Sequence, residues 1–180
     1  MKFIIVGPMN ACGYKEVFTY IKNNEVWLGN TTLKDFTCYN SDEISTVACR
    51  WLTNVDHKKR HIPIDLYKRY SNEYNHYYNY DAIDCPKITD IPYDYIGKIG
   101  VPISFLDSYC PQQFRLLGTS TSSAMLREIG VRELGEEGIR IKNDCGDKTN
   151  LSPGHCQLFW VDKNKKFCRP FVRLVVEKLY

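Results

Sequence analysis

Residues 46–61, TVACRWLTNVDHKKRH, decide how the rest of the chain can be arranged. Side chains alternate along residues 47–53 as they do in a strand, with Val47, Cys49 and Trp51 together on one face. The strand ends near Asn54 and runs directly into the cationic segment HKKRH. A strand that fixes the position of a cationic loop is typical of a site that contacts phosphate. The alternative is a solvated turn after an edge strand, whose lysines prevent that edge from pairing.

The composition indicates a folded globular protein with local basic patches. The chain has 180 residues, enough for one domain with a sizeable core. Apolar residues make up 43% and charged residues 25%, which excludes a disordered chain. A net charge of +3 is too small to indicate nucleic-acid binding by itself. However, lysine and arginine are concentrated in residues 50–70 and 162–180, and such clusters are the more informative signal.

The cysteines predict neither a disulfide framework nor a metal site. All eight are scattered singly, with no CxxC pair, whereas zinc ligands are usually spaced two to four residues apart. No signal peptide precedes the first apolar segment, and no apolar run approaches the ~20 residues of a membrane-spanning helix. We therefore expect a cytoplasmic protein with free thiols.

The N-terminal segment has the size of a strand–helix–strand unit. Residues 2–6, KFIIV, are continuously apolar and predict a strand buried on both faces, as in a parallel sheet covered by helices. Residues 14–24 have helical spacing, and residues 25–28 predict a short return strand. Residues 30–45 are polar and predict a loop. A buried strand at the start must be covered by later parts of the chain or by another molecule.

Residues 67–95 hold eight of the thirteen tyrosines, interleaved with polar residues and prolines. A buried tyrosine hydroxyl needs a hydrogen-bond partner, so this segment does not fit an ordinary core. We expect a long ordered loop on the surface. It would act either as a lid packed on the domain or as an aromatic surface on which bases stack, at ~1–3 kcal/mol per base.

The second half of the chain predicts a series of short elements. In order, they are a strand within residues 97–107, a strand at 114–118, helical patterning at 124–138 broken by two glycines, a loop at 140–154, and a closing hairpin of 158–161 and 171–179. Residues 119–123 are rich in serine and threonine and are the best position for a sub-boundary within a single domain spanning residues 1–180.

The sequence contains none of the common catalytic motifs. The sequence has no P-loop, no GxGxxG, no HExxH and no GxSxG. His57 and His61 lie among cations, which disfavour the protonated imidazole that a general acid requires. We therefore predict no catalytic residue in this chain.

Four blocks of sequence resemble the EcoRI-type adenine-specific DNA methyltransferases. They are KFIIVGPMNACGYKEVFTYIKNNEVWLG at 2–29, RWLTNVDHKKR at 50–60, NYDAIDCPKITDIPYDYIGKIGVPISFLDSYCPQQFRLLG at 79–118 and FCRPFVRLVVEK at 167–178. The resemblance implies a Rossmann-like domain, S-adenosylmethionine as methyl donor, and methylation of a flipped-out adenine.

The same resemblance implies that part of the enzyme is missing from this chain. In such enzymes a glycine-containing cofactor loop and an Asn-Pro-Pro-aromatic motif precede the segment that resembles KFIIVGPMN, and neither occurs here. We therefore expect an α/β fold that contains the later half of the Rossmann-like methyltransferase sheet, with long irregular loops and a C-terminal β-hairpin. By position, the resemblance places residues 51–60 near the target base and the phosphates.

Three functions follow from this interpretation. The first is a non-catalytic remnant that binds DNA or a partner protein, as an anti-restriction or anti-CRISPR inhibitor would. The second is the C-terminal half of a split DNA adenine methyltransferase. In that case a complementing chain would be needed for S-adenosylmethionine to bind; no cofactor is expected for this chain alone. The third is a truncated product without activity.

The predicted interface follows the basic loop and the tyrosine-rich segment. A homodimer, or a complementing methyltransferase subunit, is expected to cover residues 2–6. The residues predicted to bind nucleic acid or a partner are Arg50, Trp51, Thr53, Asn54, His57, Lys58, Lys59, Arg60, Lys68, Arg69, Tyr77, Tyr78 and Tyr80.

Overall fold

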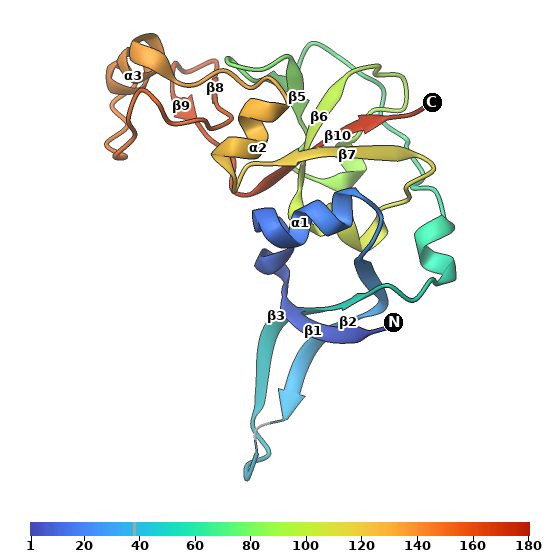
Figure 1. The fold of residues 1–180 in the computed structure, drawn as a ribbon. Helices are drawn as coiled ribbons and strands as arrows, with labels where there is room; N and C mark the ends of the chain where they lie inside the picture. Colours follow the sequence, from blue (N-terminus) through green and yellow to red (C-terminus); the bar gives the residue numbers. More distant parts are fainter. Residues whose placement is uncertain (38) are drawn as a thin grey trace.

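The computed structural model describes residues 1–37 and 39–180, which form a mixed α/β fold with three β-sheets (Figure 1). The main sheet has the strand order β4-β5-β6-β10-β7. Only β5 and β6 pair in parallel, and their neighbours are antiparallel. In that order, the strands are Asn75–His76, Ala82–Asp84, Lys98–Pro102, Arg173–Lys178 and Phe114–Thr119.

A smaller sheet lies beside the main one and has the order β1-β3-β2. Its strands are β1, Ile4–Pro8, β2, Trp27–Thr37, and β3, Ile44–Thr53. Both outer strands are antiparallel to β3, so β1 and β2 run in the same direction with β3 between them. The distal half of the β2–β3 hairpin projects away from the rest of the molecule (Figure 1).

Helix α1, Lys15–Lys22, lies between the two larger sheets (Figure 1). Its Phe18 and Ile21 are buried in the same core as Leu28 and Leu52 of the small sheet. That core continues into the main sheet. There Phe105 of the 3₁₀ segment η4, Ile103–Ser108, packs edge-on against Phe114.

A smaller group of elements covers the other end of the main sheet. Helix α2 spans Ser123–Glu128 and begins at Ser122, whose hydroxyl accepts from the Met125 amide. Helix α3, Gly135–Asp144, lies beside the two-stranded sheet of β8, Trp160–Val161, and β9, Phe167–Cys168. The remaining short segments are η1, Met9–Gly13, η2, Lys58–His61, and η3, Ile88–Asp90.

Several sequence predictions are confirmed. The predicted helix at residues 14–24 is α1, and the predicted strand at 45–54 is β3. The strands predicted within 97–107 and at 114–118 are β6 and β7. Each of these elements has a strong local pattern, and each was placed to within a few residues. Among the described residues, no helix is both long and apolar enough to span a membrane.

Other sequence predictions are wrong. The segment predicted as a loop at residues 30–45 is mostly strand, because β2 continues to Thr37 and β3 already begins at Ile44; its Cys38 lies outside the described residues. The loop predicted at residues 140–154 begins inside α3. The predicted closing hairpin forms only in part: β8 pairs with β9 across residues 162–166, whereas the predicted second strand, β10, pairs with β6 and β7 inside the main sheet. The tyrosine-rich segment at residues 67–95 is mostly irregular, as predicted, but it also contributes the short strands β4 and β5 to the same sheet.

The predicted burial of residues 2–6 on both faces of a sheet is also wrong. Strand β1 is an antiparallel edge strand and is not buried on both faces. Ile4, Ile5 and Val6 are 61%, 52% and 48% exposed. Within residues 1–37 and 39–180, its only partner in the sheet is β3.

Candidate nucleic-acid interface

The end of β3 is fixed to the N-terminal segment by two polar side chains. The Thr53 hydroxyl donates to the Phe3 carbonyl at 2.6 Å and accepts from the Val55 amide at 2.9 Å. The Asn54 side chain accepts from the Phe3 amide at 2.9 Å. Both residues were predicted to bind nucleic acid or a partner. Their side chains instead bind the backbone of Phe3 and Val55, and these contacts fix the position at which the basic loop begins.

Arg60 holds the basic loop down onto the small sheet and the end of α1. Its guanidinium carbon lies 3.9 Å from the centroid of the Trp27 ring, a cation–π contact. Its Nη2 donates to Asn24 Oδ1 at 2.9 Å, and its Nη1 lies 3.7 Å from Asp56 Oδ1. Asn24 has a φ of 58°, a left-handed conformation that asparagine adopts more easily than most residues and that is common after a helix.

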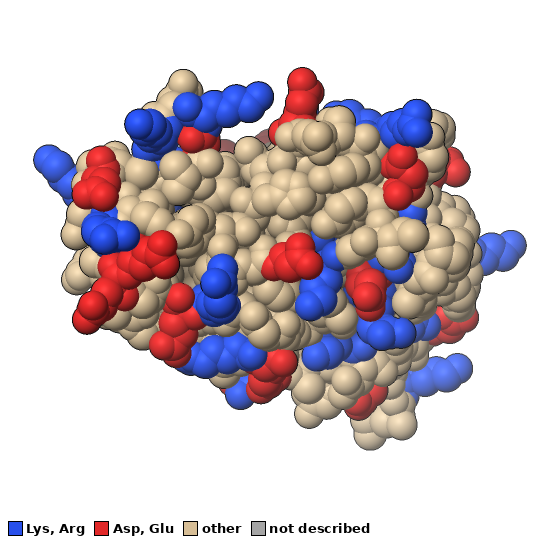
Figure 2. Space-filling model, turned by 90° about the horizontal axis from the view of Figure 1, so that it is seen from above, with Lys and Arg blue, Asp and Glu red and all other residues tan. Residues whose placement is uncertain are grey.

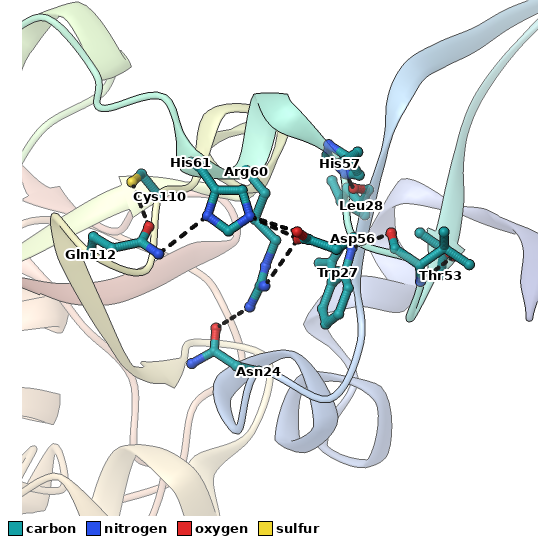
Figure 3. A network of polar contacts seen from close by, with 11 residues as sticks. Asn24, Trp27, Leu28, Thr53, Asp56, His57, Arg60, His61, Cys110 and Gln112 are labelled. Carbon is teal, nitrogen blue, oxygen red and sulfur yellow. Dashed lines mark hydrogen bonds and ion pairs between the residues drawn. The ribbon is translucent and has the colours of Figure 1, made fainter. Parts of the chain in front are cut away.

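The two histidines of the loop are also anchors (Figure 3). His57 Nε2 lies 2.8 Å from the Leu28 carbonyl of β2. His61 Nε2 lies 2.8 Å from Asp56 Oδ1, and its Nδ1 lies 3.2 Å from Gln112 Nε2. The hydrogen bond from His61 is the main reason that the pKa of Asp56 is lowered, with smaller contributions from the His57 amide and the Arg60 charge. Figure 3 shows these contacts as one network from Gln112 through Asp56 to Asn24.

Lys58 and Lys59 lie between the anchoring residues of this loop, and Lys59 also lines a small hollow beside Trp27 and Leu106. Lys58 is exposed and Lys59 is partly exposed. Among residues 1–37 and 39–180, neither ammonium group has an ion pair or a side-chain hydrogen bond. Arg60, their neighbour, is already engaged by Trp27, Asn24 and Asp56. The loop therefore holds two uncompensated positive charges on a backbone that its other members fix in place.

Arg50 and Trp51 lie in β3, before the loop, and their side chains make structural contacts. Arg50 Nε and Nη2 donate to the two oxygens of Asp107 at 2.7 and 2.9 Å, and this pairing raises the pKa of the guanidinium. Trp51 packs against Gly29 of β2, where a Cβ atom would lie only 2.7 Å from Trp51 Cβ. The small sheet therefore needs glycine at position 29.

Lys68 and Arg69 are exposed, but each faces a carboxylate. Lys68 Nζ lies 2.6 Å from Asp90, and the hydrogen bond to Asp90 is the main cause of its raised pKa. Arg69 Nε lies 3.2 Å from Asp94. Exposed pairs of this kind exchange readily with other anions, so these two cations are compensated but accessible.

The three predicted tyrosines are not arranged as a stacking surface. Tyr77 and Tyr80 are only 5% and 7% exposed. The Tyr77 hydroxyl donates to the buried Asp84, and the Tyr80 ring lies 4.8 Å from Lys98 Nζ. Tyr78 is exposed, but its ring stacks on Phe159 and its hydroxyl donates to Glu137. In this conformation the ring faces of Tyr77 and Tyr80 do not reach solvent for stacking on bases.

Sequence reasoning missed the residues that anchor the loop. Trp27, Asn24 and Gln112 all contact it, yet none was predicted as part of the site. Asn24 gave a partial signal, since asparagine often ends a helix. The other contacts join segments up to 51 residues apart, for example Gln112 with His61, so no local pattern shows them.

The comparisons with known proteins agree with the resemblance seen in the sequence. The profile of the family described as "Adenine-specific methyltransferase EcoRI" matches residues 1–178. Type II methyltransferase M.EcoRI of Escherichia coli is 38% identical over 137 residues. This chain belongs to the EcoRI-type adenine-specific methyltransferase family. Type II methyltransferase M.MgeORF184P of Mycoplasma genitalium is 32% identical over 139 residues. No solved structure matches significantly.

The EcoRI-type chain covers less than half of these relatives. Each match includes 64% of this chain but only 42% of the E. coli protein and 44% of the Mycoplasma genitalium protein. This chain therefore corresponds to only part of such an enzyme. The activity of the whole relatives does not follow for this chain by itself.

Charge on the opposite end of the EcoRI-type chain is mixed. Figure 2 looks down on the end away from the β2–β3 hairpin, where basic and acidic side chains are interspersed. No group of three or more metal-ligating side chains occurs among the residues that the structure describes. Among the cations of the predicted interface, Arg50, Arg60, Lys68 and Arg69 each lie beside a carboxylate, whereas Lys58 and Lys59 have none among the described residues.

Proposed function

We propose that this chain is a non-catalytic DNA-binding module of the EcoRI-type adenine-specific methyltransferase family, and that Lys58 and Lys59 contact the phosphate backbone. The observation that carries the proposal is the anchored loop η2. Arg60, His57 and His61 are used to hold the loop, and the two lysines between them are left without an anionic partner among the described residues.

The geometry suits phosphate for two reasons. First, a loop fixed by several contacts loses little further conformational entropy when it binds, so the lysines are preorganised. Second, each lysine that neutralises a phosphate releases condensed counterions, which is the main source of sequence-independent affinity for DNA. DNA is preferred over a protein partner for this loop because both free charges are positive, and duplex DNA presents a regular array of negative charge.

The sequence supports a module that is non-catalytic when alone. It contains no Asn-Pro-Pro-aromatic motif. A hollow of about 440 Å³ beside α1 is lined by apolar side chains together with Glu16 and Glu25, and its lining includes no glycine. We infer that this hollow does not hold S-adenosylmethionine, because it lacks the glycine turn by which the family resemblance places that cofactor. We expect no heat of binding when the isolated chain is titrated with S-adenosylmethionine.

The decisive experiment compares two double variants in DNA binding. Lys58→Ala/Lys59→Ala should weaken binding to duplex DNA and flatten the log–log salt dependence by roughly 1.8, at about 0.9 for each lost phosphate contact. Lys148→Ala/Lys163→Ala removes the same net charge from exposed positions in the α3 to β9 region. That control should leave both affinity and salt slope close to wild type.

Two results would overturn the proposal. One is a Lys58→Ala/Lys59→Ala variant with wild-type affinity and salt slope, which would make the loop a solvated turn. The other is an equal effect of both double variants, which would assign the binding to net charge alone. Circular dichroism of each variant checks that the fold is retained, as expected for exposed charges.

A second function is favoured by a separate observation. The apolar strand β1 is an open edge, which fits a methyltransferase that is completed by a polypeptide carrying the missing motifs. In this case the isolated chain would have no methyl-transfer activity, and the completed assembly would methylate adenine in DNA. A labelled-methyl assay on the chain with and without such a polypeptide separates the two functions. An inhibitor of a host defence system would instead bind its target without gaining methyl-transfer activity.

A further inference from the structure

The small sheet has one face that its own chain leaves uncovered. The strand register places Val6 beside Trp51 and Ile4 beside Thr53, and these four side chains share one face of the small sheet. We call this the outer sheet face. Ile4 and Val6 are 61% and 48% exposed there. The opposite face holds Leu28 and Leu52, which are buried in the core.

The edge of β1 is open for a further strand. Phe3 donates its amide to Asn54 and its carbonyl accepts from Thr53, so the backbone of residue 3 points toward β3. Backbone groups of successive strand residues point to alternate sides, so those of Ile4 and Val6 point away from β3. Pro8 is the next residue of β1 whose backbone points away from β3. Proline has no backbone N–H group, so it is expected at such a position on an edge strand.

Hollows lie on both sides of this edge. On the outer sheet face, Ile4, Gly29 and Trp51 line a hollow of about 320 Å³. On the other side, Ile5 lines the hollow of about 440 Å³ beside α1, together with Val17 and other side chains. Exposed apolar surface of this kind, beside an unpaired strand edge, marks an interaction site. Its apolar lining suits a polypeptide better than a nucleic acid.

We propose that β1 and the outer sheet face bind the portion of an EcoRI-type methyltransferase that lies outside the matched region, through a β-strand that pairs with the Ile4 and Val6 backbone. More than half of the E. coli relative lies outside the match, so a polypeptide of sufficient size exists in the family. The added strand would extend the sheet, and its flanking elements would fill the two hollows. This inference rests on the proposed membership of a methyltransferase assembly, and it does not require DNA.

The first test measures assembly with a defined probe. The probe is the part of the E. coli relative outside its 137 matched residues, co-produced with this chain. Ile4→Lys/Val6→Lys should reduce the affinity at least about tenfold, because the lysine charges would have to be desolvated against an apolar partner. Ile96→Lys/Val161→Lys changes two exposed apolar residues elsewhere and should bind like wild type. Equal binding by all three chains would overturn the inference.

The second test reports on strand pairing itself. In the free chain, the Ile4 and Val6 amides should exchange rapidly with deuterium, because they point away from β3. In the assembly both should become protected, since the added strand accepts their hydrogen bonds. If the probe binds while both amides keep exchanging at the free rate, no strand is added at β1 and the inference fails.

Two further outcomes separate this inference from its alternatives. If light scattering shows a homodimer that Ile4→Lys/Val6→Lys dissociates, and the probe does not bind, the surface belongs to a second copy of the chain. Lys58→Ala/Lys59→Ala should assemble with the probe normally, so loss of DNA binding and loss of assembly are distinguishable. A chain that binds DNA but never assembles would retain the proposed DNA-binding function and lose this one.

Discussion

Strands β1 and β10 contain almost the same apolar run in opposite environments. Residues 4–6 of β1 read IIV and residues 174–176 of β10 read LVV. Leu174, Val175 and Val176 are completely buried, because β10 lies between β6 and β7. Ile4, by contrast, is 61% exposed at the edge of the small sheet. An apolar sequence therefore predicts that a strand favours burial. Whether the strand is buried within the same chain depends on which other segments pack around it.

The comparison locates the part of the molecule that is available for binding. The main sheet buries its most apolar strand, because the C-terminal strand β10 lies in its interior between β6 and β7. The small sheet leaves an apolar face and a strand edge open, and the cationic loop η2 leaves from the end of its central strand. Both proposed functions therefore concern the same end of the molecule.

The largest expected effect tests the comparison directly with one charge in each strand. Val175→Lys should abolish folding or cost more than about 4 kcal/mol, because the ammonium would be buried without a partner in a domain whose total stability is of order 5–15 kcal/mol. Val6→Lys should change stability by less than about 0.5 kcal/mol, since its side chain can reach water. Urea unfolding followed by circular dichroism measures both. Similar losses in the two variants would mean that β1 is covered in the free chain.

A second prediction sharpens the comparison through two buried or partly buried ion pairs. Arg173 Nε lies 2.8 Å from Asp84 in the main sheet, and Tyr77 donates to the same carboxylate. Asp84→Ala leaves the arginine charge unpaired in the interior and should cost about 3–5 kcal/mol. Asp107→Ala removes the partner of Arg50 at the open end and should cost about 1–2 kcal/mol, because water reaches both groups there.

Urea unfolding of the two alanine variants gives the outcome. The order of the two losses is the critical result, since both variants remove one carboxylate that binds an arginine. An equal or larger loss of stability for Asp107→Ala would show that the ion pair of Arg50 is as well shielded from water as the ion pair in the main sheet.

The sequence revealed the elements that depend on local pattern. Helix α1 and strand β3 were placed correctly from periodicity, since their apolar spacing is set within a few residues. The burial of β1 and the position of β10 were not, because both depend on pairing between distant segments. Val176 of β10, for example, pairs with Ile99 and with Leu116. A long polar segment that forms a projecting hairpin likewise has no local signature.

The predicted interface shows the same division. The sequence located the basic loop, because three adjacent cations after a strand are visible in the chain. The sequence did not show which of these cations lack an anionic partner. Arg60 is engaged by Trp27, 33 positions earlier, and Arg50 by Asp107, 57 positions later. The functional assignment of Lys58 and Lys59 therefore needed the tertiary contacts, although their location did not.

The smallest expected effect concerns the hydrogen bond that joins the cationic loop to itself. His61 Nε2 contacts both oxygens of Asp56, at 2.8 and 2.9 Å, and lowers the pKa of that carboxyl below its ordinary value of 3.8. A depressed pKa in the folded state stabilises the fold above the unfolded pKa, and this contribution is lost as pH falls through the folded value. The loop should therefore loosen only in strongly acidic solution, below about pH 4.

A titration followed by NMR at the carboxyl carbons tests this assignment. His61→Ala should raise the pKa of Asp56 toward its ordinary value, since the largest cause of its depression has been removed. Asp94 is the internal control, because its pKa is lowered first by the Tyr70 amide, which the substitution leaves in place. If Asp56 keeps its low pKa in His61→Ala, the His57 amide and the Arg60 charge hold the carboxylate instead. Arg60 would then be the principal anchor of the loop that presents Lys58 and Lys59.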